Sequence, residues 1–498
     1  MSGAVSRQAV AETERAGSAV PSEREQAVLA HWRLPAARWR VHHSRRVEGI
    51  PGSLSRRLAF ERLVPVHRGS VLASYVNGAP ILRREHPHPR LFPFPFNLSQ
   101  RQAVEHALTA QVSVVEGGAG MGKTQVIVNV VANLLARPGA HVAVVAAEDA
   151  GLDDVRERLD DAGVAFAIAG LGTVARRKAF FAGQAAGNAA LGAFLAAAGR
   201  HASSEVPEAA RLGTVDEMLA VAQGAERRRS ELHGELTACE RERERFHEFV
   251  AAGIEPDLGE LPLLAVAAPA LAEAAAVVEV KAKTAALFSA IPLFNRDSVS
   301  VTMDASKASA KERGQQLIRL QVEFYQRRLQ ELGQQVSEAA HAVEQMRAPE
   351  LVDEHQALSA EAFEAALRRR FAGAPRSESA STTYWKDFEG FVRDYPVVLS
   401  RSVSLSESLS RGVMLDSVVI DGASQLDLVT AATLLACTKH VVVVGDSEPF
   451  APAADEAAAY AAAPQVNVGA YDFSRFSLLS SLVELYGAAL PRVVLRAD

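Results

Sequence analysis

The segment that most constrains this chain is a glycine-rich run with the pattern Gly, four free positions, Gly-Lys-Thr: Gly117, Gly118, Ala119, Gly120, Met121, Gly122, Lys123 and Thr124. Apolar residues over 112–116 predict a buried strand before it, and apolar periodicity over 125–135 predicts a helix after it. A strand, a glycine loop and a helix N-terminus together form a geometry that holds phosphate through backbone N–H groups and the helix dipole. In this geometry Lys123 reaches the β- and γ-phosphates, and the Thr124 hydroxyl holds Mg²⁺. The run therefore predicts nucleotide binding; the alternative is a strand-to-helix turn without a ligand.

Length and composition place the chain among cytoplasmic proteins of several domains. It has 498 residues, of which 48% are hydrophobic, and its two cysteines, Cys239 and Cys437, offer neither a disulfide framework nor a metal cluster. The polar N-terminus does not resemble a signal peptide. The most apolar window, 261–280, is interrupted by proline and glutamate, so no membrane partner is expected.

The net charge of −6 conceals an uneven distribution. Residues 1–100 contain fifteen Arg and seven Glu, without Lys or Asp, and so carry +8. Such a basic region can contact the phosphates of single-stranded DNA or RNA, with Arg45, Arg46, Arg56 and Arg57 as the candidate contacts. The alternatives are a solvated surface or a patch that pairs with acidic parts of the same protein.

Short apolar segments that alternate with helical patterns predict an α/β fold with a parallel sheet. The expected strands are 112–116, 141–147, 397–400, 417–421, 440–446 and 493–496. This topology places Asp421 and Asp446 at the carboxyl ends of their strands, where ligands bind in such sheets. Asp421 is then the acid that completes a Mg²⁺ site, and Asp446 lies near the γ-phosphate; the alternative for both is a helix N-cap.

Between 175 and 394 the strand signals nearly disappear. Apolar residues step by four and three in strict alternation, which predicts a coiled-coil seam: Ile318, Val322, Tyr325, Leu329, Leu332, Val336, Ala339, Val343 and Met346. A weaker seam runs from Ala225 to Val250, with Arg229 and Arg243 at two of its positions. Together they predict an antiparallel helical stalk, and two ordinary bundle helices are the alternative.

The ordered motifs resemble those of superfamily 1 helicases, most closely the Upf1-like group with AAA-type helicase domains. They are 97–104 with Gln100, the glycine-rich loop, Asp421-Gly422-Ala423-Ser424-Gln425, and Gly445-Asp446. The resemblance implies a P-loop NTPase fold of the RecA-like type, ATP with Mg²⁺, adenine contact by Gln100, and metal binding by Thr124 and Asp421. It also implies that Gln425 and Asp446 couple nucleotide state to nucleic-acid binding.

Two motifs depart from the family pattern. The family has Asp-Glu where this chain has Asp421-Gly422, and loss of such a general base typically lowers the rate by about 10²–10⁴. The family also has a glutamine where this chain has Pro449. After the last strand the family continues into a Tyr-Arg motif and a second RecA-like domain with arginine fingers, whereas this sequence reaches Asp498. The expectation is the N-terminal half of a motor, with a second polypeptide as a possible source of the other half.

The expected domain organisation has five parts. They are a poorly ordered N-terminus (1–28), a basic accessory region (29–95), the RecA-like domain in two parts (96–174 and 396–498), and a helical insertion with the coiled-coil stalk (175–395). The expected function is an ATP-binding, helicase-like protein with weak or no autonomous ATPase and unwinding activity. The alternatives are a pseudo-helicase scaffold or nucleic-acid-binding module that uses nucleotide only structurally, and a degenerate remnant.

Overall fold

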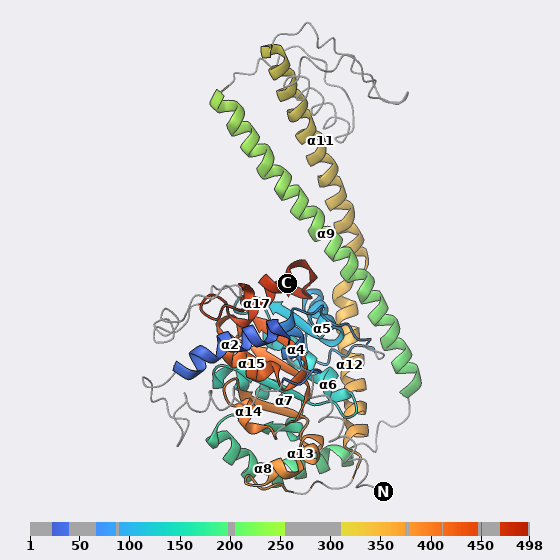
Figure 1. The fold of residues 1–498 in the computed structure, drawn as a ribbon. Helices are drawn as coiled ribbons and strands as arrows, with labels where there is room; N and C mark the ends of the chain where they lie inside the picture. Colours follow the sequence, from blue (N-terminus) through green and yellow to red (C-terminus); the bar gives the residue numbers. More distant parts are fainter. Residues whose placement is uncertain are drawn as a thin grey trace. The chain divides into compact units, whose positions relative to one another are not determined.

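The computed structural model describes residues 22–38, 66–85, 89–197, 205–253, 310–373, 376, 378–410, 412–446, 450 and 469–496. The chain divides into two compact units, one formed by Met1–Glu217 with Glu350–Asp498 and the other by Met218–Pro349. The first unit contains a sheet covered by helices, and the second contains a pair of long helices (Figure 1). Each unit has hydrophobic contacts of its own.

A seven-stranded sheet in the order β3-β4-β2-β5-β6-β1-β7 forms the centre of the first unit, and all neighbouring strands are parallel. The strands are β1 (Val112–Glu116), β2 (Val142–Ala146), β3 (Ile168–Gly170), β4 (Val397–Arg401), β5 (Leu415–Asp421), β6 (Thr438–Gly445) and β7 (Arg492–Val494). The predicted α/β fold with a parallel sheet is therefore confirmed. The sequence gives no recognisable signal for β3, because this strand has only three residues.

Valine-rich sequence explains why these strands lie in the middle of a layered domain. Every residue of β1 and of β2 is buried, as expected for parallel strands with helices on both faces. Val114 of β1 belongs to the same hydrophobic core as Val418 of β5 and Val443 of β6. Its neighbour Val115 is also fully buried and points to the opposite face, because side chains alternate along a strand.

Different helices cover the two faces because the chain crosses the sheet in opposite directions. α6 (Lys123–Ala136) connects β1 to β2 toward one edge, and α15 (Leu428–Leu435) connects β5 to β6 toward the other. Right-handed crossovers in opposite directions place the two helices on opposite faces. The core on the α15 side also includes α2 (Glu23–Arg38), α4 (Val71–Asn77), α14 (Leu405–Ser408) and α17 (Leu478–Tyr486). α6 packs with α5 (Leu98–Thr109) and α7 (Asp149–Asp161).

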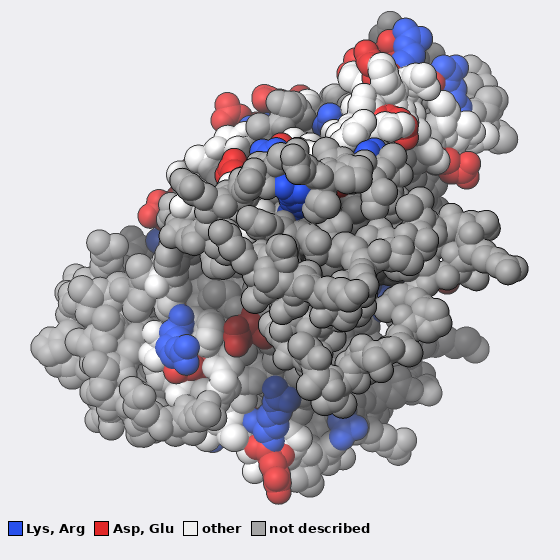
Figure 2. All heavy atoms as spheres, turned by 90° about the horizontal axis from the view of Figure 1, so that it is seen from above, with Lys and Arg blue, Asp and Glu red and all other residues white. Residues whose placement is uncertain are grey.

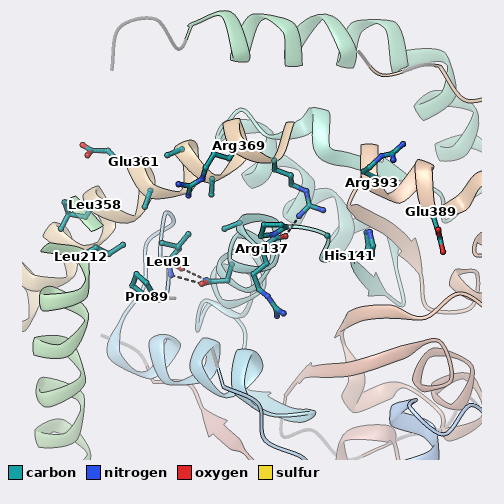
Figure 3. A pocket seen from close by; sticks show the side chains of 18 of the residues that line it. Pro89, Leu91, Arg137, His141, Leu212, Leu358, Glu361, Arg369, Glu389 and Arg393 are labelled. Atoms are coloured by element: carbon teal, nitrogen blue, oxygen red, sulfur yellow. Dashed lines mark hydrogen bonds between the residues drawn. The ribbon is translucent and has the colours of Figure 1, made fainter. Parts of the chain in front are cut away.

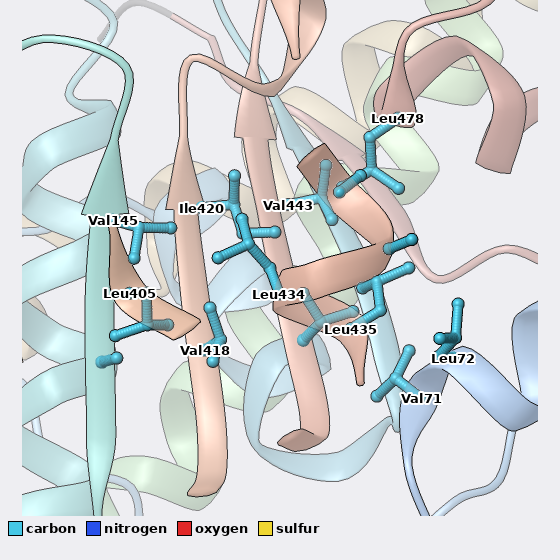
Figure 4. Packing of buried hydrophobic residues seen from close by; sticks show 14 of the residues in the cluster. Val71, Leu72, Val145, Leu405, Val418, Ile420, Leu434, Leu435, Val443 and Leu478 are labelled. Atoms are coloured by element: carbon cyan, nitrogen blue, oxygen red, sulfur yellow. The ribbon is translucent and has the colours of Figure 1, made fainter. Parts of the chain in front are cut away.

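The core between α15 and the sheet is dense and dry. Figure 4 shows Leu434 and Leu435 of α15 among sheet residues that include Val418 and Val443. These four side chains are at most 1% exposed. The remaining elements of the first unit connect or flank this core: α8 (Val174–Ala196), α12 (Ala348–Phe371), α13 (Phe388–Asp394), and the 3₁₀ turns η1 (Ala165–Ala167), η3 (Tyr384–Asp387), η4 (Ala423–Gln425), η5 (Gly469–Tyr471) and η6 (Gly487–Ala489).

The second unit is built from α9 (Glu205–Gly253), which begins in the first unit, and α11 (Ala310–Gln345). Leu232 and Cys239 of α9 pack with Tyr325 and Leu332 of α11. The pair is antiparallel, since Glu242 accepts a hydrogen bond from Tyr325 at 3.2 Å while Glu235, earlier in α9, pairs with Arg328, later in α11. The antiparallel arrangement agrees with the sequence; knobs-into-holes packing of a coiled coil stays a prediction.

The N-terminal region differs from its expected character. α2 begins at Glu23, inside the range predicted to be poorly ordered. The short apolar runs and turn signals of residues 31–90 predict a small region of β or mixed structure, but the described residues of 29–95 form helices and an extended connector, without a strand. Trp32 donates a hydrogen bond to the Tyr471 carbonyl at 3.0 Å, so α2 is part of the main core. The four candidate arginines, Arg45, Arg46, Arg56 and Arg57, lie outside the described residues.

The predicted helical insertion is larger than the second unit. The second unit spans Met218–Pro349, whereas the prediction was 175–395. α12 and α13 instead belong to the sheet-containing unit. Arg370 of α12 shows why, because its guanidinium donates to the carbonyls of Leu135, Arg137 and Ala140 at the end of α6.

One described helix, α8, is long and apolar enough to cross a membrane by length and composition alone. It nevertheless carries a hydrogen-bonded polar contact with the rest of its unit: the Gln184 side chain donates to the Ser379 carbonyl at 2.7 Å and accepts from the Ser379 N–H at 2.9 Å. The sequence had singled out 261–280 as the most apolar window, and that segment lies outside the described residues.

Candidate nucleotide-binding site

The glycine-rich loop connects the end of β1 to the start of α6, as the sequence predicts. Gly120 and Gly122 have φ of +80° and +78°, a left-handed conformation that glycine adopts without steric cost. Gly122 is the N-cap of α6, and no side chain caps this helix end. The first N–H groups of a helix have no partner within the helix, so this end is suited to an anion. Added Cβ atoms at Gly118 and Gly120 would meet nothing within 4 Å, so the loop borders open space.

Lys123, the first residue of α6, folds back over the loop. Its ammonium group donates to the carbonyl oxygens of Gly117 at 2.6 Å and Gly118 at 3.0 Å. Thr124 follows at the second helical position and is half-buried. The two side chains therefore start from the same helix turn, where the ammonium can exchange carbonyl partners for phosphate oxygens and the hydroxyl can bind a cation.

Gln100 of α5 lies directly against this loop. Its amide donates to the Met121 carbonyl at 3.3 Å and to Gln125 Oε1 at 3.0 Å, and its Oε1 accepts from the Asn97 N–H at 3.0 Å. A side chain at Gly122 would collide with this amide and with Gln125. The Gln100 amide nitrogen and oxygen both form hydrogen bonds within the protein. Contact with adenine would require one of these hydrogen bonds to be replaced by one to the base. This contact stays a prediction.

Asp421 lies at the carboxyl end of β5 and is the candidate ligand of the metal ion. Burial raises the pKa of its carboxyl group, and the negative charges of Asp154 and Asp446 raise it further. The Gly422 N–H and the positive charge of Lys123 lower this pKa but do not offset those effects. The charged form of Asp421 is thus incompletely compensated, first because it has lost solvation and then because two other carboxylates are near, and a bound divalent cation would compensate it.

The end of β6 brings the other two motifs to the loop. The Gly117 N–H donates to the Gly445 carbonyl at 3.1 Å, which joins the loop to the residue before Asp446. A Cβ at Gly445 would come within 3.0 Å of the Ser424 backbone nitrogen, so this glycine allows the 422–425 turn to approach. Gln425 ends that turn with its side chain exposed. Asp446 and Gln425 therefore both lie at the loop edge of the sheet, while Pro449 lies outside the described residues.

Gly422 has a left-handed backbone, with φ of +73°, and an added Cβ would meet nothing within 4 Å. A longer side chain has room there, but a non-glycine residue in this conformation costs roughly 1–3 kcal/mol. A glutamate at position 422, as in the family pattern, would therefore fit sterically but would strain the backbone.

Three residues of this region were missed from the sequence. Gly151 at the start of α7 leaves space for Asp421, because a Cβ there would lie 3.0 Å from Asp421 Oδ2. Asp154, one turn later, adds negative charge to the site. Glu116 is 2% exposed immediately before the loop, and Arg492 of β7 donates to its Oε2 at 2.9 Å. Only Glu116 had a visible signal, a charged residue that ends a buried strand.

The fold and the site together define a P-loop NTPase: a parallel sheet, a glycine loop that caps a helix, and an acid on a neighbouring strand. A profile of the AAA domain family, the domain found in Upf1-like superfamily 1 helicases, matches residues 95–452. The chain belongs to this family. A comparison with curated proteins found no match to the chain. Helicase-like domains of this kind generally use ATP with Mg²⁺ and bind nucleic acid.

The raised pKa of Asp421 implies that this carboxylate lowers folding stability at neutral pH while it serves Mg²⁺ binding, and both effects can be tested. A carboxyl whose pKa is higher in the folded than in the unfolded state lowers stability as pH rises through these values. We expect Asp421→Asn to raise the melting temperature at pH 7 and to abolish the dependence of nucleotide affinity on Mg²⁺. Thermal unfolding and nucleotide titrations with Mg²⁺ or EDTA measure both effects.

The exposed Asp161→Asn, which removes the same charge from the end of α7, is the matched control and should leave the Mg²⁺ dependence intact. A lower melting temperature for Asp421→Asn would show that the carboxylate is compensated within the protein and is not held ready for a cation.

Proposed function

We propose that this chain binds ATP with Mg²⁺ at the loop Gly117–Thr124 and couples the bound nucleotide to a nucleic-acid strand. The observation that carries the proposal is the convergence, at one edge of the sheet, of an uncapped helix N-terminus, the Lys123 ammonium and the half-buried Asp421 carboxylate, whose pKa is raised. Each of the three has a complementary part in a nucleotide–Mg²⁺ complex.

The residues then have distinct roles. Backbone N–H groups of the loop and of the first turn of α6 hold phosphate oxygens, and Lys123 adds a charged donor. Thr124 and Asp421 hold Mg²⁺, which neutralises phosphate charge when it is bound. Gln425 and Asp446 lie on the turns that follow β5 and β6, so a displacement at the phosphates reaches both residues through the Gly117–Gly445 bond.

Turnover is proposed to be slow in this domain alone. Gly422 follows the metal-binding acid where the family has a glutamate, and glycine cannot accept a proton from water. In the family, arginine fingers come from a second RecA-like domain, and such a residue contributes about 10³–10⁵ to turnover. We propose that this domain, in the same polypeptide or in another, completes the motor. The alternative remains a cytoplasmic scaffold that uses nucleotide only structurally.

Nucleic-acid contact is proposed at the edge of the sheet that also carries the nucleotide site. The strand register places Asp421 on one side of Ala146 and Arg401 on the other, about 10 Å apart. α8 begins at the same edge with Arg176, Arg177 and Lys178. On the face drawn in Figure 2, described Lys and Arg side chains are interspersed with Asp and Glu. The short basic segment at the start of α8 is therefore the candidate contact, and titration with DNA and RNA at several salt concentrations would test it.

The central test is Lys123→Ala. A hydrogen bond to a charged group contributes about 1.5–3 kcal/mol, which corresponds to roughly a 10- to 100-fold loss of affinity. We expect saturable binding of a fluorescent ATP analogue in the presence of Mg²⁺, weakened by that factor in Lys123→Ala and unchanged in the exposed Lys386→Ala. If the unsubstituted chain does not bind the analogue, or if both variants bind equally well, the proposal is wrong.

A further inference from the structure

A large cavity lies far from the nucleotide site, at the opposite edge of the sheet. It has a volume of about 1050 Å³ and is bordered by α12, α13, the segment before α5 and the end of α6. α6 starts at the glycine loop with Lys123 and ends at the cavity with Ala136. A helix of this length spans about 20 Å, so the cavity and the loop are separate sites.

The lining changes character along the cavity. Figure 3 shows Leu91, Leu212 and Leu358 together at one end and Arg137 and Arg369 nearer the middle. Arg393 and Glu389 lie toward the far end. The arrangement offers an apolar surface followed by guanidinium groups within one cavity.

The guanidinium groups differ in what they bind. Arg370 is committed to the fold, because its donors are used by three carbonyls at the end of α6. Arg137, Arg369 and Arg393 form no ion pair with a carboxylate of the described chain. Of the lining carboxylates, Asp387 is committed to the Gly390 N–H at 3.0 Å. Positive charge is thus available in the cavity.

The charge of Arg137 also reaches two groups outside the cavity lining, although burial has the largest effect on the pKa of each. Burial lowers the pKa of Arg84 to about 10, and the charge of Arg137 lowers it as well. Burial also lowers the pKa of His440 to about 4, with further contributions from Arg84 and Arg137. An anion bound at Arg137 would reduce its repulsion of Arg84.

We propose that this cavity binds a small amphipathic anion, with its carboxylate or phosphate group between Arg137 and Arg369 and its apolar body on Leu91, Leu212 and Leu358. The volume is in the range of cavities that enclose small molecules. A polyanion such as nucleic acid is disfavoured, because Glu361, Asp387 and Glu389 also line the cavity and the lining residues include no Phe, Tyr or Trp to stack on a base. The site is independent of the proposed nucleotide function.

The test uses the full chain and 8-anilinonaphthalene-1-sulfonate, which joins an apolar body to an anionic group and fluoresces when it is bound in an apolar site. We expect saturable binding of one probe molecule per chain, weakened about tenfold or more by Arg369→Ala or Arg137→Ala. Arg211→Ala removes an exposed charge beside the cavity and is the matched control. Lys123→Ala should bind the probe as the unsubstituted chain does. Circular dichroism establishes that each variant is folded.

Competitors of equal chain length identify the charged group. Decanoate or decyl phosphate should displace the probe, and the better of the two shows whether carboxylate or phosphate is preferred. Decanol should displace it poorly. As a second variant, Ala365→Phe narrows the cavity without changing charge and should also weaken binding. Equal displacement by decanol, or equal binding by Arg369→Ala, Arg137→Ala and Arg211→Ala, would overturn the proposal, as would the absence of saturable binding.

Discussion

Gly422→Glu is expected to raise the ATP turnover of this chain by about 10²-fold, the lower end of what a general base contributes. In the proposed site Asp421 supplies the metal-binding carboxylate at the end of β5, so the substitution adds only the group that accepts a proton from water. The lower end applies because Gly422 has a φ of +73°, and glutamate in this conformation carries a strain of roughly 1–3 kcal/mol. Part of the variant population will therefore hold the turn in a different conformation.

The matched control is Gly422→Gln, which has the same size and backbone strain as glutamate but cannot act as a base. Steady-state phosphate release by the two variants, with and without single-stranded nucleic acid, separates chemistry from conformation. The double variant Lys123→Ala/Gly422→Glu should be inactive, which assigns the turnover to the glycine loop. Equal rates for the glutamate and glutamine variants would mean that the missing base does not limit turnover, and that the groups of a second RecA-like domain do.

Local sequence patterns were sufficient for the strands that carry the site. β1, β2, β5 and β6 are rich in buried valine, and all but β2 end in glycine or an acid, so their type, direction and carboxyl ends could be predicted. The glycine loop is recognisable because its chemistry is carried by contiguous residues. β3 escaped prediction because three residues show no periodicity. The helices of the accessory region were not predicted, because α4 has only seven residues and α2 is held by contacts distant along the chain, such as that between Trp32 and Tyr471.

What the sequence did not show depends on residues that are distant along the chain. Glu116 and Arg492 are 376 positions apart, and the cavity at the end of α6 combines residues from 89 to 393. No local pattern reports such pairs, because each partner alone resembles an ordinary surface charge. The same is true of Arg101, which is adjacent to Gln100 but points away from the loop into a buried network of charges.

That network supports the second prediction with a large expected effect. Arg101 is 0% exposed, and its guanidinium donates to Asp216 Oδ1 at 2.7 Å and to the Asp216 carbonyl at 3.1 Å. His355, also fully buried, places Nε2 3.5 Å from Asp216 Oδ1. The network fastens α5, which carries Gln100, to the start of α9 and to α12. Removal of one partner from a buried ion pair costs about 3–5 kcal/mol. Because Arg90 Nη1 remains 3.4 Å from Asp216 Oδ2, Arg101→Met is expected to lower the free energy of unfolding by about 3 kcal/mol, the lower end of this range.

The pH dependence of unfolding distinguishes a lost ion pair from lost packing. Burial alone would raise the pKa of Asp216, but the adjacent His355 imidazole and the charge and hydrogen bond of Arg101 outweigh it and lower the pKa from 3.8 to about 2. Because the folded-state pKa is depressed, the stability that it contributes is complete above the unfolded value and is lost as pH falls from about 4 to about 2. Denaturant titrations of the unsubstituted chain should show this loss, and those of Arg101→Met should show less of it. The double variant Arg101→Met/Asp216→Leu, which leaves no unpaired charge, should recover part of the stability; a double variant as unstable as the sum of the two single variants would contradict the role of this ion pair.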